Sequence, residues 1–215
     1  MRLLFGIFAL LFFLAAQTSQ AAWACEGQDG KAVLDDKFAD DAGGWLFDNR
    51  VLSLAAPGAR IYLQAGAGAA IILNRTFDMN AGDFCVETSY TSEALKVNAG
   101  FGVIFWAKDL KDLWSAAAFP TGDVMLSHLN EGNWQTVWKT TVPSLFKSSA
   151  GATNAMRVIA KDETITVDLN GTTIKSVRAK QPPADATLYF GVYVGPTRKT
   201  STPFSVNLHS FTAME

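Results

Sequence analysis

Short runs of alternating apolar and polar residues, separated by turn residues, recur along most of the chain. Successive side chains of a β-strand point to opposite faces, so alternation with a period of two predicts half-buried strands. The clearest example is residues 164–169, followed by Asn170-Gly171 and residues 172–177. Asn-Gly is a favoured two-residue hairpin turn because both residues tolerate positive φ. The pattern therefore predicts a β-hairpin in this region.

The same pattern predicts a series of further strands, joined by turns rich in Gly, Pro, Asn and Asp. These strands are residues 51–54, 60–63, 69–73, 83–91, 100–107, 113–119, 124–130, 133–140, 187–194 and 204–211. Residues 100–107 are apolar on both faces, which indicates a central strand covered on both sides. We find no amphipathic helix of useful length, internal repeat or linker. About a dozen strands at this spacing predict an all-β sandwich of two antiparallel sheets, in one domain over residues 25–215.

The first residues break the alternation with a nearly continuous apolar run, residues 3–16, after Arg2. Small residues follow at positions 21, 22 and 24, as at a signal-peptide cleavage site. The run is shorter than the roughly 20 residues of a membrane-spanning helix. We therefore expect residues 1–24 to be a signal peptide and the protein to be periplasmic or secreted, with no transmembrane segment in the mature chain. A membrane anchor and a lipoprotein beginning at Cys25 are the alternatives, and the bulky Trp23 argues against lipidation.

The chain contains two cysteines, Cys25 and Cys85. In an exported protein an even pair is more often bridged than free. Closing a loop of about 60 residues would stabilise the fold by roughly 4 kcal/mol in the chain-entropy model. We therefore predict a Cys25–Cys85 disulfide, with two separate buried thiols as the alternative.

Charge excludes one class of partner. The net charge is −2, with 18 basic and 20 acidic residues, and removing Arg2 with residues 1–24 makes it −3. No basic stripe is present, so the sequence offers nothing that attracts a nucleic acid electrostatically.

Several segments resemble the concanavalin A-like lectin/glucanase superfamily. The opening residues 35–45, the apolar run 101–106 with Leu113-Trp114, and Gly132-Asn133-Trp134 all fit its pattern. The strongest match is NAMRV (154–158) followed by VDLNG (167–171), which is similar to laminin-G-like and 3-keto-disaccharide hydrolase-type domains. The resemblance covers residues 33–213 and implies a jelly-roll sandwich. It does not choose among lectins, glycosidases and adhesion modules.

Glycosidases of this fold commonly carry a Glu-x-Asp-x-x-Glu motif, and this chain has none. Asp83 and Glu87 share one face of a predicted strand, but about 13 Å separates them, too far for a retaining pair of carboxyls roughly 5 Å apart. We interpret them as solvated acids at a sheet edge. A catalytic pair whose two carboxylates come from different strands remains an alternative.

Metal ligands are sparse. His128 and His209 have no cysteine or carboxylate cluster at ligand spacing, so zinc is not expected. We interpret His128 as a surface or half-buried residue of a strand. Lectin-like sandwiches often hold Ca²⁺ through loop oxygens, and acids near the mature N-terminus are candidate ligands or ordinary solvated loop acids. These acids are Asp35, Asp36, Asp40 and Asp41.

Aromatic residues suggest a binding surface, because the apolar C–H faces of sugar rings stack on aromatic planes. The candidate ligand-binding residues are Trp106, Trp114 and Trp138, with His128, Gln135 and Lys139 adding polar contacts. Trp106 should lie opposite the core-facing Phe105, and Trp134 and Trp138 should share a face. The alternative is that the tryptophans are core packing, most of all Trp134 at its Gly-x-Trp position.

These observations favour an exported, carbohydrate-binding sandwich with no evident catalytic residue and a glycan or sugar-containing ligand. Two alternatives remain open. One is a glycoside or keto-sugar hydrolase whose carboxylates come from different strands. The other is a structural or protein-interaction sandwich whose tryptophans lie in the core.

Overall fold

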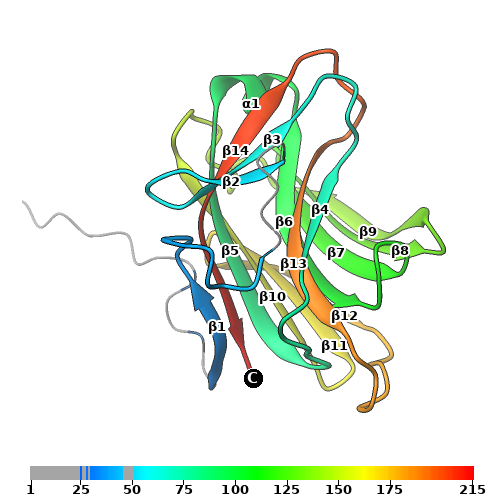
Figure 1. Cartoon of the computed structure of the whole chain (residues 1–215). Helices are drawn as coiled ribbons and strands as arrows, with labels where there is room; N and C mark the ends of the chain where they lie inside the picture. Colours follow the sequence, from blue (N-terminus) through cyan, green and yellow to red (C-terminus); the bar gives the residue numbers. More distant parts are fainter. Residues whose placement is uncertain (1–24, 26–27, 29, 46–50) are drawn as a thin grey trace, which may run out of the picture.

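The computed structural model describes Cys25, Gln28 and residues 30–45 and 51–215. Their strands form two antiparallel sheets packed face to face (Figure 1). The predicted all-β sandwich is therefore confirmed. The predicted signal peptide, residues 1–24, lies outside the described residues.

Sheet A has the order β12-β11-β10-β5-β14-β3-β2, and β1 pairs with β14 beside β3. Its strands are β1 (Ala32–Asp36), β2 (Leu52–Leu54), β3 (Ala59–Leu63), β5 (Gly82–Tyr90), β10 (Thr153–Lys161), β11 (Thr164–Leu169), β12 (Thr172–Arg178) and β14 (Phe204–Met214). The predicted hairpin is present, since Leu169 pairs with Thr172 around Asn170-Gly171, both at positive φ. The alternation did not predict β1, which is short and ends in two acids.

Sheet B has the order β4-β13-β6-β7-β8-β9. Its strands are β4 (Ala70–Asn74), β6 (Ala99–Ala107), β7 (Leu113–Ala118), β8 (Asp123–Asn130), β9 (Asn133–Thr141) and β13 (Tyr189–Pro196). All nine residues of β6 are buried, as its continuous apolar run predicts. A helix of five residues, α1 (Ser92–Lys96), joins β5 to β6, with Thr91 as its N-cap. No described helix is long and apolar enough to cross a membrane.

One hydrophobic core fills the space between the sheets, built from the alternating inward residues of both. Its largest side chains include Phe84 and Phe211 from sheet A and Phe101, Phe105 and Phe190 from sheet B. The rings of Phe190 and Phe211 stack across the core with centroids 5.5 Å apart. Cys25 and Cys85 form the predicted disulfide, on the outer face of sheet A.

Two β-bulges change which side chains face the core. In β6, Ile104 and Ala107 pair with Gly191 and Tyr189, so Phe105 and Trp106 together oppose Phe190. Trp106 adopts a φ of 48° and turns inward beside Phe105, their ring centroids 5.4 Å apart. The expectation that Trp106 faces away from the core is therefore wrong, because the extra residue shifts the alternation.

The second bulge lies in β9. Leu126 pairs with Trp138 while Ser127 pairs with Thr136, which makes Val137 the extra residue. Trp138 therefore packs on the core side with Leu126, and Trp134 lies on the opposite face. The expectation that the two tryptophans share a face is wrong for the same reason.

Candidate functional site

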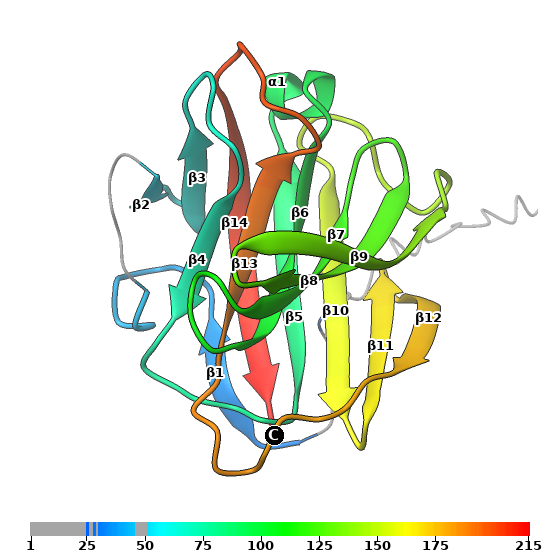
Figure 2. The ribbon, with the colours of Figure 1, turned by 90° about the vertical axis from the view of Figure 1, so that its right-hand side faces the viewer.

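The outer face of sheet B is strongly concave. Tyr193 of β13 and Trp134 of β9 lie on strands separated by β6, β7 and β8. In a flat sheet four strand spacings would separate them by roughly 19 Å, yet their ring centroids lie 6.2 Å apart. The sheet must curl for this contact to form. Figure 1 shows β7–β9 projecting sideways from the rest of the sheet, and in Figure 2 β8 and β9 cross in front of β13.

The curl encloses a hollow of about 450 Å³, which we call the concave groove. Small or flexible side chains line its floor, and the two aromatic rings form a wall. The lining residues are Ala69, Ser115, Ala117, Phe119, Met125, Ser127, Trp134, Thr136, Lys139, Tyr193, Pro196 and Thr197. Gly102, between Tyr193 and Ala117 in the sheet, adds no side chain to this face. The floor is low because β6 and β7 carry glycine, serine and alanine there.

A small apolar cluster supports the aromatic wall. It contains Ile104, Leu113 and Leu129, all buried, and Tyr193 packs against it. Burial raises the pKa of the Tyr193 phenol to about 12, so it stays neutral at physiological pH. Trp134 leans on Tyr193 edge-on, with an interplanar angle of 82°, and is 46% exposed. An indole held in this way and open to solvent is ready to stack on a ligand.

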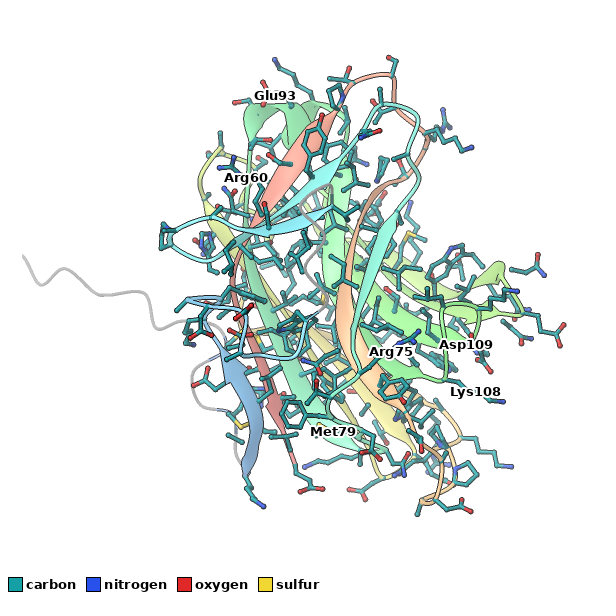
Figure 3. All side chains as sticks on the ribbon, viewed as in Figure 1. Arg60, Arg75, Met79, Glu93, Lys108 and Asp109 are labelled. Atoms are coloured by element: carbon teal, nitrogen blue, oxygen red, sulfur yellow. A yellow bond between two sulfur atoms is a disulfide. The ribbon has the colours of Figure 1, made fainter. Side chains whose placement is uncertain are left out.

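The turn before β7 completes this part of the site. Asp109 Oδ1 accepts hydrogen bonds from the backbone N–H groups of Lys111 and Asp112. The carbonyl of Lys111 accepts one from Gly132, in the β8–β9 turn. Figure 3, where Lys108 and Asp109 are labelled, shows this turn on the same side of the molecule as the projecting strands. These contacts link two loops that border the curl.

One ion pair lies at the other end of the groove. Lys139 Nζ lies 2.8 Å from Asp123 Oδ2, and Thr141 donates a hydrogen bond to Asp123 Oδ1. The hydrogen bond from Lys139 is the main cause that lowers the pKa of Asp123, with Thr141 acting in the same direction. Because the two charges neutralise each other, this end of the groove is polar without a strong net charge.

The structure divides the predicted ligand-binding residues among three places. Lys139 lines the concave groove. Trp106 is 3% exposed and donates its indole N–H to the carbonyl of Asn80, so it cannot stack a ligand. Trp138 is half-buried against the core, opposite the groove.

The other three lie together on the core-side face of sheet B, away from the groove. The His128 ring stacks on Trp114 with centroids 4.9 Å apart, and its Nε2 lies 3.1 Å from Asp112 Oδ1. Gln135 pairs with His128 across the strands. The interpretation of His128 as half-buried agrees with its side-chain exposure of 26%.

Residue types and alternation alone did not identify most of the groove. Trp134, the tryptophan most expected in core packing, is exposed in the groove, and no pattern in the sequence points to Tyr193. One signal was available. The run Ser115-Ala116-Ala117-Ala118 lies in a strand next to a Gly102 strand, and small residues on neighbouring strands mark places where another group approaches closely.

The two acids of the predicted β5 strand lie on the other sheet. Asp83 and Glu87 are both buried on the outer face of sheet A, in the central strand β5. Asp83 forms an ion pair with Arg157 and Glu87 accepts a hydrogen bond from Ser210. The interpretation of these acids as solvated edge residues is therefore wrong, because β10 and β14 flank β5. No Asp or Glu is among the described residues that line the concave groove.

The candidate calcium ligands do not assemble a site. Both carboxylate oxygens of Asp36 accept hydrogen bonds, from the backbone N–H of Phe38 and the indole of Trp45. Asp35 pairs with Lys37, and Asp40 caps a local turn through the N–H of Ala42. Within the described ranges no three His, Cys, Asp or Glu side chains are placed to share a metal ion. These acids therefore do not fit Ca²⁺, which needs several oxygens converging on one point.

Comparison with known proteins identifies the fold. No protein-family model matches the chain, and no curated protein matches it in sequence. Solved structures do match it. Carbohydrate-binding module CBM66 from Bacillus subtilis is 13% identical, with a TM-score of 0.62 over 80% of this chain and 96% of the module. The laminarinase from Rhodothermus marinus is 9% identical, with a TM-score of 0.64 over 87% of this chain and 98% of its own.

A β-glucanase from Bacillus licheniformis is also similar, at 12% identity and a TM-score of 0.60 over 87% of this chain and 100% of the glucanase. The chain thus has the concanavalin A-like jelly-roll fold that its sequence resembles. At these identities the likeness is one of architecture.

Proposed function

We propose that this protein is an exported carbohydrate-binding sandwich, which holds a glycan in the concave groove and catalyses no reaction on it. The observation that carries the proposal is the exposed indole of Trp134, braced by Tyr193 above a floor of small polar and apolar residues. A sugar ring presents an apolar face to an aromatic plane and hydroxyl groups to its surroundings. Ser115, Ser127 and Thr136 supply hydroxyl partners beside the stacking surface.

The structural neighbours support a carbohydrate as the ligand. One is a carbohydrate-binding module and others are glucanases, and a further neighbour, LamA from Z. galactanivorans, is in complex with laminaritriose and laminaritetraose. We infer a neutral glycan, because the Lys139–Asp123 pair at the groove neutralises its own charges.

The distribution of carboxylates argues against hydrolysis. Glycoside hydrolysis needs two carboxyls on either side of the scissile bond, about 5–9.5 Å apart. The described lining of the groove contains none, and Asp83 and Glu87 lie on the outer face of the other sheet. Binding without hydrolysis is therefore the better supported of the two functions. Export belongs to the proposal through the predicted signal peptide, residues 1–24.

A glycan array, run with and without calcium, tests the proposal first. Trp134→Ala should weaken binding of any glycan that scores by about tenfold or more, corresponding to about 1.4 kcal/mol. Val137→Ala is the matched control, because Val137 is similarly exposed on the same strand but is the bulge residue and does not line the groove. Titration calorimetry gives the affinities.

Three results would contradict the proposal. Absence of binding across the array would favour the structural or protein-interaction sandwich. Equal affinity of wild type and Trp134→Ala would place the glycan elsewhere. Release of reducing sugar from a bound glucan would show that the protein is a hydrolase.

A further inference from the structure

A second cavity, of about 550 Å³, opens on the outer face of sheet A. Its floor contains Glu87 from β5 and His209 and Ser210 from β14. Gln28 forms part of one wall and Pro57 part of another. It lies on the opposite sheet from the concave groove and shares no lining residue with it.

A gap in the strand ladder creates this cavity. On one edge of β14, β3 pairs as far as Leu208, and β1 begins to pair only at Phe211. His209 and Ser210 fall between these two partners. On the other edge, the register of β14 against β5 shifts between Leu208 and Ser210, so that His209 is an extra residue. Bulges commonly redirect a side chain beside a functional site.

The floor of the cavity carries a buried negative charge. Glu87 is 2% exposed, and Ser210 Oγ donates a hydrogen bond of 2.9 Å to Glu87 Oε2. A carboxylate has room for about four hydrogen bonds, so this contact leaves acceptor capacity. At the rim, Lys37 Nζ lies 3.2 Å from Asp35 Oδ1. Over the lining residues that the structure describes, this pair cancels and the charge of Glu87 remains.

His209 adds no compensating positive charge near neutral pH. Burial lowers the pKa of its imidazole, while the Glu87 carboxylate and the Pro57 carbonyl act in the opposite direction. Its Nε2 lies 2.9 Å from Ser89 Oγ, which holds the ring in place beside Glu87.

The wall formed by Cys25 and Gln28 is fixed before any ligand arrives. The Gln28 amide donates to the Asp83 carbonyl and carboxylate at 2.9 and 2.8 Å, and Thr212 Oγ1 donates to Gln28 Oε1. The disulfide with Cys85 ties Cys25 to β5. Small-molecule sites are usually preformed in this manner.

We propose that this cavity is a second binding site, for a small ligand that carries an ammonium group. The ammonium donates a hydrogen bond to the Glu87 carboxylate at the floor. Because both groups are charged, this hydrogen bond is stronger than one between neutral groups. The body of the ligand lies between Pro57 and Met214, which offer apolar surface. An amino sugar and an alkyl diamine both present this group, and the two sources can be separated experimentally.

Two-dimensional ¹H–¹⁵N NMR titrations of the full mature chain test the site, with glucosamine hydrochloride and pentane-1,5-diamine as probes. N-acetylglucosamine is the control for the first probe, because it keeps the sugar ring while its amide nitrogen carries no charge. Glucosamine, the diamine or both should shift the amides of Glu87, His209 and Ser210, and N-acetylglucosamine should not. The responding probe identifies the source of the ammonium group.

Substitutions then separate this site from its surroundings. Glu87→Gln keeps an acceptor for Ser210 and should weaken binding of the responding probe by about tenfold or more. Asp35→Asn removes the same charge at the rim and should change the affinity less than about threefold, because exposed ion pairs contribute little. Trp134→Ala, which alters only the concave groove, should leave the affinity of the probe for this cavity unchanged.

The proposal is overturned if neither amine shifts these amides, or if N-acetylglucosamine shifts them equally. It is also overturned if Glu87→Gln folds and binds with unchanged affinity. Should that variant not fold, the shifts in the wild-type protein decide the matter alone. A failure here leaves glycan binding in the concave groove untouched.

Discussion

Trp134 and Trp106 differ in exposure because of what lies beneath each ring. Trp106 is enclosed by Phe105 and Trp114 and bonded to a backbone carbonyl. Trp134 rests on Tyr193 alone among the described aromatic rings and stays 46% exposed. A large apolar side chain open to solvent at a concave surface is informative, whereas a buried one reports packing. Of these two tryptophans, only Trp134 therefore supports a proposal about ligand binding.

His209 gives a prediction about pH. Burial lowers its pKa from the ordinary 6.5, so the folded protein binds the proton less readily than the unfolded chain. Its contribution to stability is therefore complete above about pH 6.5 and is lost as the pH falls through the lowered value. Urea unfolding of wild type and His209→Gln, on both sides of this pH, isolates the effect from that of the carboxylates. The wild type should lose more stability on acidification, and an identical loss in the variant would contradict the prediction.

Among the strands, β6 and β7 set the depth of the groove. A side chain at Gly102 would place its Cβ 1.9 Å from the carbonyl oxygen of Ala116 and 2.7 Å from the Cα of Ala117. Both are backbone atoms, so relief requires the two strands to move apart. The glycine thereby keeps the floor low and the sheet continuous.

Gly102→Ala should accordingly destabilise the fold by about 1–3 kcal/mol, as overpacking does, and weaken glycan binding. Gly68→Ala is the control, because a Cβ there meets nothing within 4 Å and its φ is not positive. Urea unfolding measures the first effect and calorimetry the second. Equal stability of the two variants would show that the floor tolerates a side chain.

The strands show which parts of the structure the sequence could predict. The hairpin at Asn170-Gly171 and the buried β6 depend on local chemistry, and the sequence predicted the first from alternation and the second from a continuous apolar run. The groove depends on bulges at Trp106 and Val137, each of which shifts the alternation after it. It also depends on a curl that brings Trp134 to Tyr193, a contact between distant parts of the chain. Residue type alone marks neither these bulges nor the curl, so of the six predicted ligand-binding residues only Lys139 lines the groove.

At the scale of the whole molecule, the disulfide joins the start of the described chain to the centre of sheet A. It links residues 60 positions apart. A Cys25→Ser/Cys85→Ser double variant should therefore lose up to about 4 kcal/mol of unfolding free energy in the chain-entropy model. Urea unfolding of wild type with and without reductant provides the control. A loss below about 1 kcal/mol would mean that the unfolded chain is already restricted without the bridge.

The two outer faces of the sandwich thus have different chemistry. The face of sheet B is concave and aromatic, and the described residues that line its groove include no carboxylate, while the face of sheet A carries buried acids and the disulfide. The proposed glycan suits the face of sheet B, and the proposed ammonium-bearing ligand suits the face of sheet A. This separation lets each be tested without disturbing the other.

The most direct test of glycan binding in the groove is an NMR titration that follows the tryptophan indole N–H signals, with the best glycan from the array as ligand. The signal of Trp134 should move until binding saturates, while that of the buried Trp106 stays in place. If the glycan binds but the signals of Trp114 and Trp138 move while that of Trp134 does not, the ligand occupies the other face of sheet B and the central claim is wrong.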